Sequence, residues 1–163
     1  MLFRSEMEAL ANIILNGEYS LVAFAGFECG DLAPWVVEGD TKAVNISSEA
    51  QNVKTGKYAL HYWLNDPFTF TLTQKITGLE NGAYTLSAVM QGGGGEESIQ
   101  LFASGYGGDT LTVGIINTGW QQWQSPAIKN IQVANGECTV GLKVIAKAGN
   151  WAFFDDVSLT KNK

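Results

Sequence analysis

Two tryptophans occur next to turn residues in this sequence. Trp63 closes the run His61-Tyr62-Trp63 and precedes Asn65-Asp66-Pro67, and Trp151 follows Gly149-Asn150. Such turn residues predict loops, so we expect both indoles at a loop mouth. A flat aromatic ring beside hydrogen-bonding groups can bind the apolar face of a sugar ring while its neighbours bind the hydroxyls.

Further polar and aromatic residues are candidates for the same site. His61 shares the side of Trp63 by the period-two alternation of a strand, and Gln91 ends a strand just before the Gly92–Gly95 loop. Asn150 offers an amide beside Trp151, and Tyr106 lies between glycines as a possible mobile third platform. Each of these residues could equally be an ordinary surface or core residue.

The other tryptophans are expected to be structural. They are Trp35, Trp120 and Trp123, of which the last two belong to a TGWQQWQS stretch that is typical of a segment packed across a sandwich edge.

The sequence argues against catalysis. It contains one His, no Gly-x-Ser-x-Gly elbow and no phosphate-binding loop. Its adjacent carboxylate pairs are Glu96-Glu97, in a Gly-rich loop, and Asp155-Asp156, on a strand where neighbours point to opposite faces. Neither pair is placed as a glycosidase couple. We therefore expect a protein that is not an enzyme.

Composition restricts the class of partner. The chain has 163 residues, a net charge of -6, 16% charged residues and 45% hydrophobic residues, which fits one folded domain. Its bases are scattered, so nucleic acid is a poor partner. No run approaches the about 18 apolar residues of a membrane span, so no membrane association is expected. Cys29 and Cys138 could form one disulfide or remain two buried thiols.

Short alternating segments separated by turn residues predict an all-β fold, an antiparallel β-sandwich. Asn81-Gly82 is predicted to join 68–76 to 84–91 as a hairpin, and Asn135-Gly136 to join 128–133 to 139–146. We expect the domain to span residues 12–160. Residues 1–11 are expected to be an N-terminal extension or linker remnant, although 5–15 also has a weakly helical pattern and 12–15 could be a first strand.

Two segments at opposite ends of the chain resemble one family. GFECGDLAPW (26–35) and GNWAFFDDVSL (149–159), with TGKYAL (55–60) and LENGAYTLSA (79–88) between them, are similar to carbohydrate-binding modules with the galactose-binding-like jelly-roll sandwich. Within that group the chain resembles family 61, whose members bind β-1,4-galactan and are attached to endo-β-1,4-galactanases. The segment 18–25 is a longer insert than this family pattern predicts.

The resemblance implies a structural Ca²⁺ held by Glu28 and Asp155, with carbonyls of 52–57 as further ligands. Independently, alternation predicts that Asp155 shares the core side of its strand with Phe153, Val157 and Leu159, where a carboxylate needs a partner. The alternative is that Asp155 only accepts backbone N–H bonds and that Glu28 is solvated.

The resemblance also implies the function. We expect a monomeric, secreted module, its signal peptide lying outside this chain, that binds plant cell-wall polysaccharide and targets an appended glycoside hydrolase to it. The alternative from a different class is a protein-binding or structural sandwich domain of an extracellular protein, because one fold hosts many functions.

Overall fold

The computed structural model describes residues 4, 20–23 and 25–163. Within this part of the chain the regular elements are β1 (Val36–Gly39), η1 (Thr41–Ala43), β2 (Val44–Ser47), η2 (Ala50–Asn52), β3 (Ala59–Trp63), β4 (Phe68–Ile76), β5 (Gly82–Gly92), β6 (Ser98–Ser104), β7 (Leu111–Gly114), β8 (Gly119–Gln124), β9 (Ala127–Val133), β10 (Cys138–Ala146) and β11 (Trp151–Lys161). The expected strands at 68–76, 84–91, 128–133 and 139–146 are all present, with bounds within two residues of those predicted.

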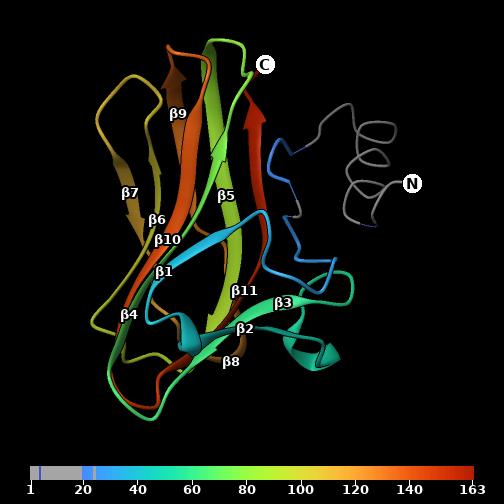
Figure 1. Ribbon diagram of the computed structural model, residues 1–163, viewed down its shortest axis with the longest axis vertical. Helices are drawn as coiled ribbons and strands as arrows, with labels where there is room; N and C mark the ends of the chain where they lie inside the picture. The colour runs from blue at the N-terminus through green and yellow to red at the C-terminus, as the bar shows by residue number, and fades with distance from the viewer. Residues whose placement is uncertain (1–3, 5–19, 24) are drawn as a thin grey trace.

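Two antiparallel sheets face each other, as the all-β sandwich prediction requires (Figure 1). One sheet has the order β1-β4-β10-β6-β7. The other has the order β2-β3-β11-β5-β8, and β9 also pairs with β5. We call the second sheet the binding sheet, because its outer face carries most of the candidate residues.

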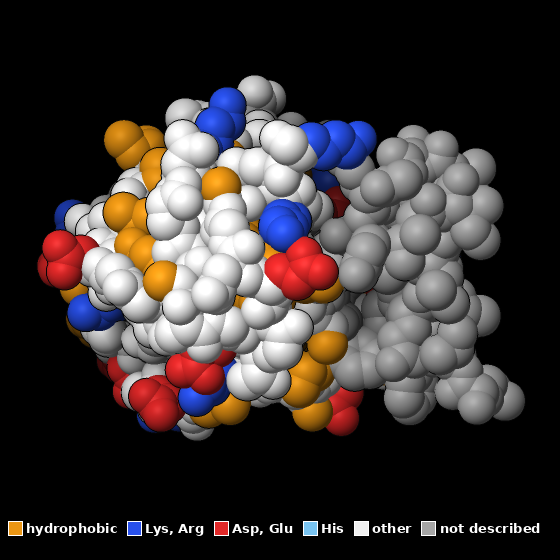
Figure 2. Space-filling view, turned by 90° about the horizontal axis from the view of Figure 1, so that it is seen from above, with side chains coloured by type: hydrophobic (Ala, Val, Ile, Leu, Met, Phe, Trp, Pro, Cys, Tyr) orange, Lys and Arg blue, Asp and Glu red, His pale blue; other side chains and the backbone are white. Residues whose placement is uncertain are grey.

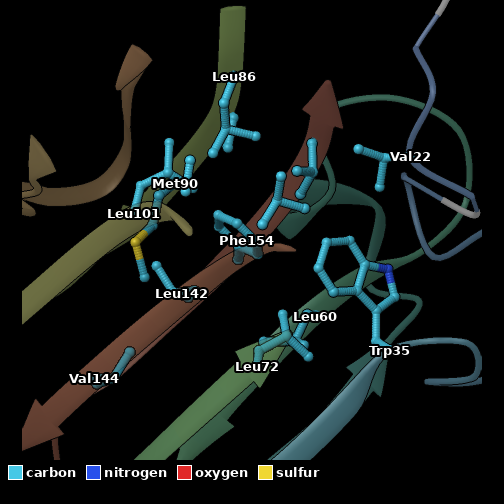
Figure 3. Packing of buried hydrophobic residues seen from close by; sticks show 14 of the residues in the cluster. Val22, Trp35, Leu60, Leu72, Leu86, Met90, Leu101, Leu142, Val144 and Phe154 are labelled. Atoms are coloured by element: carbon cyan, nitrogen blue, oxygen red, sulfur yellow. The ribbon is translucent and has the colours of Figure 1, made fainter. Parts of the chain in front are cut away.

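The core fills the space between the sheets (Figure 3). On the binding sheet, alternate residues of β5 are buried, as expected from their period-two spacing. They meet Leu142 and Val144 of β10 and Leu72 of β4 from the other sheet. Trp35 is also buried, 5.8 Å from Phe27 between ring centroids, which confirms that it is structural.

The two predicted hairpins are wrong. Strand β4 pairs with β1 and β10, whereas β5 pairs with β11, β8 and β9, so Asn81-Gly82 connects strands of opposite sheets. Asn135-Gly136 likewise connects β9 to β10 across the sandwich. The two strands that flank each turn bury one face in the same core, whether they pair in one sheet or lie in opposite sheets. The alternation of apolar residues therefore cannot distinguish a hairpin from a connection between the two sheets. The two turns contact each other instead, since the Gly136 N–H donates to Asn81 Oδ1 at 3.1 Å.

The proposed extension at 1–11 and the possible helix or strand within 5–15 lie almost wholly outside the described residues. Among the residues that are described, no helix is long and apolar enough to cross a membrane.

Cys29 and Cys138 do not form a disulfide, and burial raises the pKa of the Cys138 thiol to about 11. The end of the sandwich seen from above mixes charges of both signs with polar and hydrophobic side chains (Figure 2).

A glycine at the centre of β10 gives a stability test. A Cβ on Gly141 would lie 2.5 Å from Phe102 Cζ and 2.6 Å from the Leu72 carbonyl oxygen. We expect Gly141→Ala to lower the free energy of unfolding by about 1–3 kcal/mol through overpacking, measured by urea denaturation. Gly114→Ala in β7 is the matched control, because nothing lies within 4 Å of its added Cβ. Equal stability of the two variants would contradict this account of the core.

Candidate functional site

The outer face of the binding sheet brings four aromatic side chains together. Strands β3 and β11 pair so that Trp63 lies opposite Trp151 and His61 opposite Phe153. Tyr62 is buried in the core between them, so its neighbours His61 and Trp63 point outward. We call His61, Trp63, Trp151 and Phe153 the aromatic platform.

Ring contacts join three members of the aromatic platform, His61, Trp151 and Phe153. His61 stacks on Phe153 with ring centroids 4.6 Å apart and an interplanar angle of 28°. Trp151 meets Phe153 edge-on at 5.9 Å. Phe153 is only 6% exposed, whereas Trp63 is 44% exposed. Phe153 is not among the site residues predicted from the sequence, although its spacing of two from Trp151 is a usable signal. Phe153 therefore supports the rings that can contact a ligand.

His61 is an uncharged polar group within this cluster. Its Nδ1 lies 3.0 Å from Oδ1 of Asn45, the residue opposite it on β2. Burial lowers the pKa of His61, and the nearby Glu49 opposes that shift only in part. Because Asn45 Oδ1 accepts the proton of Nδ1, the neutral ring leaves Nε2 as an acceptor, which suits the O–H of a hydroxyl ligand.

The glycine loop after β5 positions Trp151. A Cβ on Gly93 would lie 2.7 Å from Trp151 Nε1, so a side chain there would displace the indole. Asn150 donates from Nδ2 to the Gly94 carbonyl at 3.3 Å and accepts the Lys147 N–H at 2.7 Å. Both amide atoms of this predicted sugar-binding residue are thus engaged inside the protein, and Asn150 orders the loop beside Trp151.

Strand β8 bulges over the predicted ligand-binding Gln91. Gly119 pairs with Gly92 and Gln124 with Met90, so four residues of β8 stand opposite one residue of β5. The Gln121 N–H donates to Gln91 Oε1. Gln91 is fully buried. The expectation that Gln91 is presented directly to a ligand is therefore wrong, because Gln91 is buried and holds the bulge of β8.

The bulge exposes Trp120, which the TGWQQWQS pattern predicts to be structural. Trp120 is 55% exposed, and its Nε1–H donates to Asn52 Oδ1 at 2.8 Å. Trp123 is half-buried, with the Lys54 ammonium 5.7 Å from its ring centroid. Trp120 is therefore not a core residue, because its exposure follows from an irregular pairing register that cannot be read from a local sequence pattern.

Tyr106 is far from the aromatic platform, so its assignment as a mobile platform is also wrong. It is 5% exposed, and its hydroxyl donates to the Asp109 carbonyl oxygen. Its loop follows the end of β6 that pairs with the start of β10, and the Ala134 N–H donates to its carbonyl. Trp151 instead follows the other end of β10. The glycines around Tyr106 indicated a loop but not the end of the sandwich at which that loop lies.

The predicted metal residues do lie together, beside the 54–58 segment. Glu28 is 6% exposed and accepts the N–H groups of Lys57 and Tyr58. Asp155 is fully buried and accepts the N–H groups of Lys54 and Thr55. Asp155 thus accepts backbone N–H bonds, as the alternative without a metal predicts, but Glu28 is not solvated as that alternative also predicts.

A β-bulge places Asp155 on a different face from the one predicted. The register of β11 against β5 shifts between Asp155 and Ser158, and Asp156 has a φ of 49°. Phe154 before the bulge and Val157 after it are both core residues, so the parity of the strand changes. Asp155 thus lies on the outer face with Phe153, where the 54–55 backbone covers it.

One solved structure resembles the chain both in fold and in sequence. TmCBM61, determined in complex with β-1,4-galactotriose, matches with a TM-score of 0.84 and 36% sequence identity over 88% of this chain and 99% of that one. The chain belongs to family 61 of the carbohydrate-binding modules.

More distant modules share the fold with this family 61 member. The CBM22-1 xylan-binding domain of Paenibacillus barcinonensis Xyn10C has a TM-score of 0.60 and 14% identity over 90% of this chain and 97% of that one. A family 16 module has a TM-score of 0.64 and 13% identity over 85% and 98%. At these identities the likeness concerns the sandwich alone. No family model and no curated protein matches the sequence.

The acidic residues of the family 61 module fit a hard cation by ligand type. Burial raises the pKa of Asp155 to about 8, and Asp156 adds to the shift, although backbone N–H groups oppose it. Arg4 Nε lies 3.9 Å from Glu28 Oε2. Among the described residues, no group of three or more His, Cys, Asp and Glu forms a metal site. Because Ca²⁺ takes about six to eight oxygens, backbone or water oxygens would have to supply most of its ligands.

The neutral state of His61 predicts a pH dependence of stability. Its folded pKa is below the ordinary 6.5, so the unfolded chain binds a proton that the folded module does not. The free energy of unfolding therefore keeps its full His61 contribution above about pH 6.5. It decreases as the pH falls from there toward the folded pKa of His61. Urea unfolding of wild type and His61→Gln between about pH 5 and pH 8 measures this component by difference. A difference that does not change with pH would contradict it.

Proposed function

We propose that this module binds β-1,4-galactan through the aromatic platform and targets an appended glycoside hydrolase to plant cell-wall polysaccharide. The observation that carries the proposal is the exposed Trp63 beside Trp151 in a member of the family whose TmCBM61 structure holds β-1,4-galactotriose. The fold itself is shared with modules for other glycans, so the specificity has to come from the site.

Binding would combine ring stacking with hydroxyl recognition. Trp63 and Trp151 would stack against the apolar faces of sugar rings, and the neutral His61 would bind a hydroxyl. Its partner Asn45 fixes the imidazole through a 3.0 Å contact. The axial hydroxyl of galactose would then distinguish galactan from glucan and xylan.

The proposed role requires only modest affinity. An exposed site gains little free energy after the cost of ordering the ligand is subtracted. For an enzyme joined to the module, such binding still raises the local concentration of its substrate. We further propose that the module works as a secreted monomer, as the extracellular location of plant cell-wall polysaccharide favours.

Calorimetric titration with β-1,4-galactan oligosaccharides tests the function. We expect heat of binding with galactan oligosaccharides and none with cellohexaose or xylohexaose. Trp63→Ala should weaken galactan binding by about tenfold or more, because it removes the most exposed ring of the platform.

Tyr106→Phe is the control for the titration, because Tyr106 is buried at the other end of the sandwich. It should bind as wild type does. Heat with none of the glycans would instead favour a protein-binding or spacer role. Binding that survives Trp63→Ala would place the site elsewhere.

We also propose that Ca²⁺ braces the module through Glu28 and Asp155. The ion would join the segment before β1 to β11 and would favour the ionised form of Asp155, whose pKa burial raises. Support comes from the burial of both carboxylates and from Gly26, on which a Cβ would lie 3.5 Å from Asp155 Oδ1 and 3.5 Å from Glu28 Cγ.

Thermal unfolding in excess EDTA and in Ca²⁺ tests the brace. A ligand at 100 times its Kd stabilises by about 2.7 kcal/mol, so Ca²⁺ should raise the Tm by about 5–10 °C without being required for folding. Glu28→Gln should abolish this response, whereas Glu97→Gln, at an exposed position, should keep it. Identical melting curves of wild type in EDTA and Ca²⁺ would exclude a stabilising ion.

A further inference from the structure

Trp120 presents a large aromatic surface to solvent. Its side chain is 55% exposed, more than the 44% of Trp63 on the aromatic platform. Burial of an indole is strongly favourable, so an indole left this exposed contributes little to folding. The stability of the core therefore does not explain the exposed position of Trp120.

A hydrogen-bond chain fixes the orientation of the Trp120 indole. Its Nε1–H donates to Asn52 Oδ1 at 2.8 Å, and Asn52 Nδ2 donates in turn to Glu49 Oε2 at 2.6 Å. Asn52 is 7% exposed, so its amide is held within the protein. A ring that is oriented before a ligand arrives loses little further entropy on binding.

The backbone beside Trp120 adopts an unfavourable conformation. Gln121 has a φ of 61°, a left-handed value that is uncommon for residues other than glycine. Its N–H donates to the buried Gln91 Oε1, and its Nε2 donates to the Gln51 carbonyl at 3.4 Å. Residues held in such conformations by their surroundings cluster at binding and active sites.

The strand order sets the distance between the two exposed tryptophans. Strands β11 and β5 lie between β3, which carries Trp63, and β8, which carries Trp120. Three strand spacings amount to ~14 Å across the sheet. One sugar ring is about the size of an aromatic side chain, so a single ring cannot contact both indoles, whereas an oligosaccharide running across the strands can.

We propose that Trp120 stacks on a sugar ring of the same galactan chain that contacts Trp63, so that the module binds a segment of at least three residues across β3, β11, β5 and β8. This inference rests on the proposed function. It assigns a binding role to Trp120 and a positioning role to Asn52 and Gln91, which hold the indole and the bulge. A protein ligand on Trp120 is the competing outcome.

Titration with galactose oligomers of increasing length tests the inference. We expect Trp120→Ala to weaken binding of β-1,4-galactotetraose roughly 3- to 10-fold, as expected for the loss of one stacked ring, and to leave β-1,4-galactobiose binding unchanged. Trp120→Phe should restore most of the tetraose affinity, because a flat ring remains. Trp63→Ala should weaken binding of both oligomers.

Trp123→Ala is the matched control, since it removes the same side-chain type from the same strand and should keep the wild-type tetraose affinity. In NMR spectra, the Trp120 indole N–H resonance, assigned by its loss in Trp120→Phe, should shift with tetraose but not with galactobiose.

Unchanged tetraose affinity in Trp120→Ala, or an equal loss for both oligomers, would overturn the role of Trp120 while leaving the galactan function intact. A wild-type module that binds no galactan would instead refute the proposed function itself.

Discussion

The bulge in β11 is the constraint on which both the core and the candidate site depend. An undistorted strand would keep odd-numbered residues on one face, and β11 does not, because its register shifts between Asp155 and Ser158. Phe154 before the shift and Val157 after it can therefore both pack in the core. Phe153 and Asp155, which precede the shift, lie on the outer face, where Phe153 supports the other rings of the aromatic platform and Asp155 lies under the 54–55 backbone. A strand that lies between β3 and β5 thus serves both surfaces of its sheet.

Irregular backbone elsewhere in the binding sheet has a comparable effect. The Gly93 position leaves room for the indole of Trp151, and the bulge of β8 lifts Trp120 away from the core. Regular strands would present alternate side chains in flat rows. Bulges near strand ends redirect side chains without disturbing the opposite face, and they occur frequently beside functional sites. Bulges and glycines can therefore change which side chains the outer face of the binding sheet presents, while the core between the sheets keeps its regular packing.

Neutral groups dominate the candidate site, which is consistent with an uncharged ligand. His61 is kept neutral by burial, and Asn45, Asn52 and Gln91 contribute amides and not charges. Hydrogen bonds among these groups fix the geometry before a ligand binds, which reduces the ordering cost of binding. The buried carboxylates Glu28 and Asp155 instead accept backbone N–H groups of the 54–58 segment and hold this segment against the sheet.

The sequence by itself determined the all-β sandwich, four of its strands at 68–76, 84–91, 128–133 and 139–146, the family, and a candidate site that includes Trp63, Trp151 and His61. These features follow from local alternation, turn residues and motif order, which are properties of short segments. The tertiary structure decided the partners of each strand, and this corrected the hairpins at Asn81 and Asn135 and the position of Tyr106. It also decided the face of Asp155, the burial of Gln91 and the exposure of Trp120. Each depends on register shifts or on contacts between distant segments, and a one-residue shift moves a side chain to the other face of a sheet without changing the local sequence pattern.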